Sequence, residues 1–188
     1  MLGTVFPVNL EGDGKFSCII NLQGKQASKF EEALKSLSIG DEVAVKKGRR
    51  LLSIAAKNCD PIKKITIIAT SLGVSPALQM VQYLSAEQAS VVEEVDFLWV
   101  NKNRDEFICD DLVEGVSRSF PRLEVTRFIN NFMDSEAFET KDFAGALPAY
   151  DYGSIVVVCG PKSFAELLRP VVTSRGYAPE NVLQLETK

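Results

Sequence analysis

The amino-acid sequence predicts an α/β protein with a doubly wound parallel five-stranded sheet, preceded by a partial antiparallel β-barrel. From residue 61 onward, runs rich in Val and Ile alternate with amphipathic segments, the rhythm of strand and helix in turn. Before that point the apolar runs are short and separated by turns, with a single helical pattern among them. The stretch "NCDPIKK" divides the two regions, so we predict a barrel-like domain at 1–60 and an α/β domain at 61–188.

The second region contains five expected strands, at "KITIIAT", "EEVDFLWV", "RLEVTRFI", "SIVVVCG" and "NVLQLE". Helices are expected from about Pro76 to Leu84, within "RDEFICDDLVEGVSRSF" and within "PKSFAELLRPVVTSRGY". An irregular acidic and aromatic segment separates the third strand from the fourth. Because the strands are apolar along nearly their whole length, they fit a parallel sheet covered by helices on both faces.

The first region is predicted to be β structure with one short helix. Strands are expected at "TVFPVNL", "FSCIINL", "EVAVKK" and "RRLLSIAA". Between the second and third of these, "SKFEEALKSL" places Phe30, Ala33, Leu34 and Leu37 at helical spacing. Four strands with open edges make a poor independent domain, so these edges are expected to need a cover.

Composition excludes several classes of protein. A net charge of -4 gives no reason to expect nucleic acid or an anionic membrane as a partner. No apolar run approaches the roughly 20 residues that span a bilayer, and the first residues lack the basic and apolar regions of a signal peptide. A cytoplasmic protein is the default expectation, and an organellar one if an N-terminal segment is missing.

Cysteine and histidine usage narrows the chemistry. The four cysteines are widely spaced, with no CxxC pair, so neither a metal site nor a disulfide framework is predicted. The chain has no histidine, which removes Ser-His and Cys-His catalysis and His-ligated metals. Any reaction is therefore expected to be carried by a cofactor.

Two strand-to-helix junctions carry the candidate site. After the first strand, Gly73 allows unusual backbone angles or close approach, Ser75 can cap a helix and Pro76 suits a first turn. After the fourth strand, the triplet "CGP" leads into another helix. Ligands of open α/β sheets bind at such carboxyl ends, so both junctions are expected to face one crevice. The alternative interpretation is a pair of well-capped turns without a ligand.

Together these segments resemble the nucleotide-binding domain of the ferredoxin-NADP reductase superfamily, most closely NADH-cytochrome b5 reductase. Gly73-Val74-Ser75-Pro76 matches the core of that family's glycine-rich turn, and Cys159-Gly160-Pro161 matches its Cys-Gly-Pro signature. The family's strand ending in an aromatic residue and Asn, followed by an acidic helix start, matches Trp99 to Glu106. Order and spacing agree over nearly all of residues 61 to 185, so the resemblance implies the family's α/β fold.

The resemblance extends upstream with less agreement. "GKQASKFEEALKSLSIGD" is similar to the end of the family's flavin-binding barrel, where Gly24, Lys25 and Ser28 would hold the diphosphate of FAD. The family's Arg-x-Tyr flavin motif is replaced by "GTVF" at residues 3–6. Ser71 and Leu72 stand where the glycine-rich turn has Gly and Thr, and Leu72 would intrude where nicotinamide and flavin should meet.

The implied function is an NAD(P)H-binding electron-transfer module that passes hydride from NAD(P)H to FAD, and electrons onward to a one-electron acceptor. Ser75 and Cys159 are the implied catalytic-site residues, with Cys159 bordering the nicotinamide. Asn101, Lys102 and Arg104 would lie near the adenosine ribose, where the two cations could accept a 2′-phosphate. The implied cofactor-binding residues are Gly73, Val74, Ser75, Pro76, Asn101, Lys102, Arg104, Cys159, Gly160 and Pro161, together with Gly24, Lys25 and Ser28.

The implied partner is a redox protein such as a cytochrome or a ferredoxin-type protein, or a larger assembly that covers the open barrel edge. A function of another class stays open at this point. In that alternative the chain is a degenerate reductase-like structural or docking subunit, without flavin or catalysis. A nucleotide-binding module without redox chemistry is a third interpretation.

Overall fold

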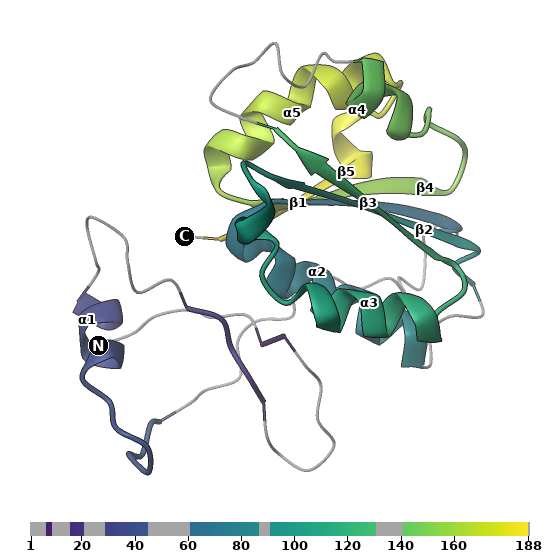
Figure 1. The fold of residues 1–188 in the computed structure, drawn as a ribbon. Helices are drawn as coiled ribbons and strands as arrows, with labels where there is room; N and C mark the ends of the chain where they lie inside the picture. The colour runs from purple at the N-terminus through teal and green to yellow at the C-terminus, as the bar shows by residue number, and fades with distance from the viewer. Residues whose placement is uncertain are drawn as a thin grey trace.

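A computed structural model describes residues 7–8, 16–20, 29–44, 61–86, 91–130 and 141–187. Its main body is a five-stranded sheet in the order β3-β2-β1-β4-β5, as Figure 1 shows. The strands are β1 (Lys64–Ala69), β2 (Glu94–Asn101), β3 (Leu123–Ile129), β4 (Ser154–Gly160) and β5 (Val182–Glu186). Each neighbouring pair in this sheet is parallel. The predicted five-stranded parallel sheet is confirmed.

Helices cover both faces of this sheet (Figure 1). The helices and short 3-10 turns of this body are η1 (Ser71–Gly73), α2 (Val74–Ala86), η2 (Arg104–Glu106), α3 (Asp110–Ser119), α4 (Lys141–Ala146), α5 (Lys162–Ser174) and η4 (Pro179–Asn181). Helices α2 and α3 lie on one face, and α4 and α5 lie on the other. The chain builds β1, β2 and β3 in one direction and then returns to place β4 beside β1. The strand order therefore reverses between β1 and β4, where ligands of such folds bind.

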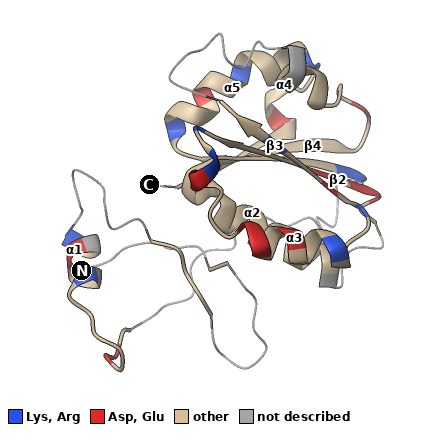
Figure 2. Ribbon diagram, viewed as in Figure 1, with Lys and Arg blue, Asp and Glu red and all other residues tan. Residues whose placement is uncertain are grey.

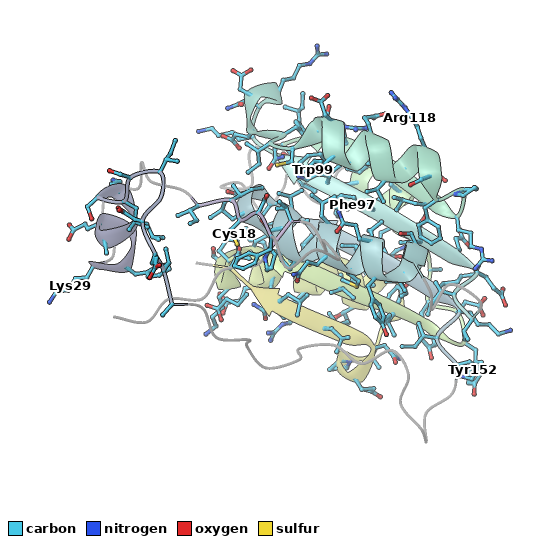
Figure 3. The ribbon with its side chains drawn as sticks, turned by 90° about the horizontal axis from the view of Figure 1, so that it is seen from below. Cys18, Lys29, Phe97, Trp99, Arg118 and Tyr152 are labelled. Atoms are coloured by element: carbon cyan, nitrogen blue, oxygen red, sulfur yellow. The ribbon has the colours of Figure 1, made fainter. Side chains whose placement is uncertain are left out.

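The alternation of side chains along the strands produces two apolar clusters. On β1, Ile65 and Ile67 face the α2/α3 side, whereas Ile68 faces the α4/α5 side. All three are fully buried, as expected for a central parallel strand. Phe97 and Trp99 of β2 belong to the cluster on the α2/α3 side and are labelled in Figure 3. This double cover holds the ends of β1 and β4 in fixed positions.

Two helices differ from the sequence-based expectation. Helix α2 begins at Val74, two residues before the expected start at Pro76. Proline is tolerated anywhere its missing N–H would be unpaired, and that holds for the whole first turn. Helix α4 forms within the segment expected to be irregular, because Phe143 is buried against the sheet and anchors it.

In the amino-terminal region the structure describes helix α1 (Lys29–Lys35), which was expected, and an antiparallel bridge between Pro7 and Cys18. Val8 is buried, and its carbonyl accepts a hydrogen bond of 3.1 Å from Gln82 of α2. Residues 41–44, the described part of "EVAVKK" and its flank, form no strand. The other expected strands fall largely outside the described residues, so the partial barrel and the boundary at residue 60 stay predictions.

None of the helices within the described residues combines the length and the hydropathy needed to cross a membrane.

Candidate functional site

The turn after β1 and the turn after β4 touch each other at the point where the strand order reverses. The N–H of Thr70 donates to the carbonyl of Cys159 at 3.1 Å. A Cβ atom built on Gly73 would lie 2.0 Å from that same carbonyl oxygen. Only glycine therefore fits at position 73, because the backbone of η1 lies directly against the end of β4.

Ser71 adopts a backbone angle that glycine usually provides. Its φ is +49°, in the left-handed region, where a non-glycine residue costs about 1–2 kcal/mol. Its N–H donates to the side-chain oxygen of Asn101 at 2.9 Å. The turn thus keeps a left-handed residue without the glycine of the family pattern, and a hydrogen bond from β2 supports it.

Two buried hydroxyl groups beside this turn have no hydrogen-bond partner. Thr70 is 2% exposed and Ser75 is 3% exposed, and neither hydroxyl oxygen is paired. Ser75 is not the helix cap that the sequence suggested, because α2 already begins at Val74. Buried polar groups are nearly always paired, so these two oxygens are exceptions, as are side-chain atoms of Gln82, Trp99 and Arg175 elsewhere in the described residues.

The first turns of helices α2, α3 and α5 differ in the charged residues that they contain. The first turns of α2 and α5 contain no acidic residue, whereas α3 begins with Asp110 and Asp111, and α2 carries no charged side chain at all (Figure 2). Free N–H groups give a helix start a partial positive charge. The starts of α2 and α5 therefore carry no carboxylate of their own that would compete with an anion, whereas α3 carries two.

The end of β2 supplies the third side of the site. Asn101 is fully buried, and the side chains of Lys102 and Arg104 are exposed. The carboxylate of Glu106 accepts from the N–H of Lys102 and from the side chain of Asn103, both at 3.1 Å. This carboxylate holds the loop in shape and leaves its two cations facing solvent.

At the second junction, after β4, the side chain of Cys159 is buried and the backbone of Gly160 lies close to neighbouring side chains. Cys159 is fully buried, and burial raises the pKa of its thiol, so the group is a neutral thiol at neutral pH. A Cβ on Gly160 would lie 2.9 Å from the methyl group of Thr70 and 3.0 Å from the ring of Phe164. Pro161 precedes α5 and is exposed.

Side chains of the first junction point inward for the most part. Val74 and Pro76 are buried, so these predicted cofactor-binding residues can offer a ligand little beyond their backbone. Thr70 was not among the predicted site residues, although a polar residue ending the apolar run "KITIIA" is a signal that could have found it. Gly24, Lys25 and Ser28, the predicted flavin-binding residues, lie outside the described residues.

In the parts of the chain that the structure describes, no group of three or more His, Cys, Asp or Glu side chains is placed to hold a metal ion. The described cysteines, Cys18, Cys109 and Cys159, are free thiols.

Acidic side chains gather at the opposite side of the sheet, where strands β2 and β3 begin. A hollow of about 360 Å³ is lined by residues Glu93, Glu94, Asp96, Pro121, Arg122, Leu123 and Glu124. Burial of Asp96, with repulsion from Glu94 and Glu124, raises the pKa of its carboxyl to about 6.

Comparison with known proteins gives distant sequence relatives and solved structures of the same fold. No protein family model matches the chain. It is 21% identical over 186 residues to NADH-cytochrome b5 reductase 1 of Coccidioides immitis, covering 94% of this chain and 59% of that protein. It is 25% identical over 125 residues to NADH-cytochrome b5 reductase 1 of Ajellomyces capsulatus, covering 62% and 40%. The chain therefore spans between two fifths and three fifths of these curated relatives.

Solved structures show the same fold. The cytochrome b5 reductase domain of Ulva prolifera nitrate reductase aligns with a TM-score of 0.77 at 20% identity, over 96% of this chain and 76% of that one. A ferredoxin-NADP+ reductase from Plasmodium falciparum, solved with 2′P-AMP, aligns with a TM-score of 0.60 at 15% identity, over 85% and 66%. The chain has the fold of the ferredoxin-NADP reductase superfamily.

Proposed function

We propose that this chain binds NAD(P)H across the carboxyl edge of its sheet, as the nucleotide-binding part of an electron-transfer reductase. One observation carries the proposal: two helix starts free of acidic residues adjoin the reversal point of the sheet. A dinucleotide diphosphate is an anion, which the positive ends of two helix dipoles would attract. The site thus fits the group that the resemblance implies.

The proposed contacts follow from exposure. The backbone of Gly73, Val74 and Ser75 would lie closest to the diphosphate, because these residues join η1 to the start of α2. The N–H groups of Gly73 and Val74 already donate to carbonyls of the turn, so the attraction would come from the dipole of α2. Lys102 and Arg104 would lie beside the adenosine ribose, where their charge favours a 2′-phosphate and hence NADPH over NADH. Gly160 and Pro161 would supply backbone at the start of α5.

The chemistry would come from the cofactors. When bound, NAD(P)H and FAD would supply hydride transfer and single-electron release to an acceptor such as a cytochrome or a ferredoxin-type protein. The residues of this chain would orient the nucleotide and exclude water, which hydride transfer needs more than an acid or base. A site without histidine is compatible with this task. The role of Cys159 would be to fill the core beneath the nicotinamide, since its thiol is buried and neutral.

A second candidate is a reductase-like structural or docking subunit without flavin or catalysis. It is favoured by three apolar side chains in the amino-terminal region, Phe16, Ile39 and Val43, which are 47%, 109% and 55% exposed. Exposed apolar side chains mark a surface that another protein covers where they form one contiguous patch, and this candidate requires that these three do so.

Calorimetric titration of the purified chain with NADPH and NADH tests the proposal, together with its visible spectrum. We expect micromolar binding of NADPH, and a Lys102→Ala/Arg104→Ala variant that loses about tenfold in affinity for NADPH but less for NADH. Arg118→Ala is the matched control, because Arg118 is an exposed cation at the far end of α3. Flavin absorbance would extend the proposal to FAD. Absence of binding at millimolar nucleotide would overturn it and favour the docking subunit.

A further inference from the structure

Asn101 joins the two loops that would hold the two halves of the dinucleotide. It is the last residue of β2, and its side chain is fully buried. The register places Trp99 of β2 opposite Ala69 of β1, so Asn101 lies two residues further on, beside Ser71. Its position is therefore fixed by the sheet and not by the loop that follows it.

The side-chain amide of Asn101 accepts one hydrogen bond and donates another. Its oxygen accepts the N–H of Ser71 at 2.9 Å, and its nitrogen donates to the carbonyl of Glu106 at 3.1 Å. One partner belongs to the turn that enters α2, and the other belongs to η2. A single side chain thus links Ser71 and Glu106, which lie 35 positions apart in the sequence.

Each of the two partners, Ser71 and Glu106, helps to set the conformation of its own loop. Ser71 has a left-handed backbone, which a serine adopts only when its surroundings hold it there. The carboxylate of Glu106 fixes Lys102 and Asn103. The next residue, Phe107, packs edge-on against Trp99 with ring centroids 4.9 Å apart, so the loop is anchored at its far end as well.

We propose that Asn101 is a positioning residue that sets the distance between the diphosphate loop and the adenosine loop. This inference rests on the proposed function and changes the role expected for Asn101, from ribose contact to a link behind the ligand. A dinucleotide must meet both loops at once, whereas a mononucleotide can be held by one of them. Loss of the link should therefore weaken dinucleotide binding more than mononucleotide binding.

The test is calorimetric titration of three proteins with NADPH and with AMP: the wild-type chain, Asn101→Ala, and Asn101→Ala combined with Ser71→Gly. Thermal melting first establishes a temperature at which each protein is folded. We expect Asn101→Ala to bind NADPH about tenfold more weakly, with AMP affinity changed by less than about twofold. The double variant should recover only part of the NADPH affinity, because glycine adopts the left-handed angle without support but does not restore the link to Glu106.

The outcomes separate the two proposals. If the wild-type chain binds neither nucleotide, the proposed function fails. If it binds NADPH but Asn101→Ala binds equally well, or loses AMP and NADPH affinity alike, only the positioning role is overturned. Full recovery of NADPH affinity in the double variant would also overturn it, because the link to Glu106 is still missing there. Should Asn101→Ala not fold, Asn101→Ser replaces it, since its hydroxyl is too short to reach both loops but can keep one hydrogen bond, and the same comparison decides.

Discussion

The strands of the sheet end at one side, the carboxyl edge, and begin at the other, the amino edge, and polar groups are arranged differently at the two. At the carboxyl edge, Asn101 and Ser71 are joined by a hydrogen bond, and glycine lets backbone approach backbone. At the amino edge, Asp96 shares a hollow with Glu94 and Glu124, and the carboxylates repel each other. The difference shows that one edge is held by close backbone contacts and a buried hydrogen bond, whereas the other gathers like charges in a partly solvated hollow.

The carboxyl edge should be the more sensitive of the two to substitution. Its contacts are between backbone atoms that cannot move without shifting β4 and α2 together. The amino edge is held by exposed ion pairs such as Lys64 with Glu94, at 3.2 Å, which contribute little to stability. Four substitutions test this contrast, in decreasing order of expected effect.

Gly73→Ala should have the largest effect. The new methyl group would lie 2.0 Å from the carbonyl oxygen of Cys159, so the end of β4 must move. We expect the free energy of unfolding to fall by about 3 kcal/mol, measured by urea denaturation. Gly115→Ala is the matched control, because nothing lies within 4 Å of the added atom in α3, and it should stabilise by about 0.5–1 kcal/mol. Equal effects of the two would contradict the close approach.

Asp96→Asn should relieve the amino edge. The pKa of Asp96 is raised to about 6 in the folded state, above the value near 3.9 of an unfolded chain. The folded state therefore binds more protons between these pH values, and its stability falls as pH rises from about 4 to about 6.

Above that window the wild-type chain should be less stable than Asp96→Asn by about 1 kcal/mol, a figure reduced because the carboxylate is partly solvated. Urea denaturation of both proteins from pH 4 to pH 8 measures the difference. Glu180→Gln removes an exposed charge outside the hollow and serves as the control. A difference between Asp96→Asn and the wild type that stays constant with pH would rule out this account.

Ser71→Gly, at the carboxyl edge, should raise the free energy of unfolding by about 0.5 kcal/mol. Glycine removes the cost of the left-handed angle but adds freedom to the unfolded chain, so only part of the strain is recovered. The same change at Ser117, inside α3, should destabilise by about 0.5 kcal/mol. Thermal melting of the two variants should therefore move in opposite directions. If Ser71→Gly melts lower than the wild type, the left-handed angle carries no strain.

Ser163→Asp should have the smallest effect on stability and should separate stability from binding. An aspartate in the first turn of α5 interacts favourably with the helix dipole, which adds about 0.3 kcal/mol. The same charge would repel a bound diphosphate, so we expect about fivefold weaker NADPH binding by calorimetry. Asp111→Asn, at the start of α3, should lower stability slightly and leave binding unchanged. Unchanged NADPH affinity in Ser163→Asp would place the diphosphate away from α5.

The candidate site was predictable in part. The Gly73 turn and the "CGP" triplet stand out as small-residue breaks between an apolar strand and a helix, so their place at a sheet edge follows from local sequence. The link between Ser71 and Asn101 could not be predicted in this way, because it depends on how β1 and β2 are aligned. Thr70 and Ser75 were ambiguous for a similar reason, since hydroxyl groups are common both in caps and in cores.

The sequence by itself determined the parallel sheet, the order of strand and helix, and the two junctions. These properties follow from the period of apolar residues and from glycine and proline, which act over a few neighbouring positions. Tertiary structure alone decided that Gly73 meets the carbonyl of Cys159, that the Cys159 thiol is sealed in the core, and that Asn101 supports a left-handed serine. The contacts of Gly73 and Ser71 each join η1 to another strand, and the alignment of β1 with β2 and β4 brings them together.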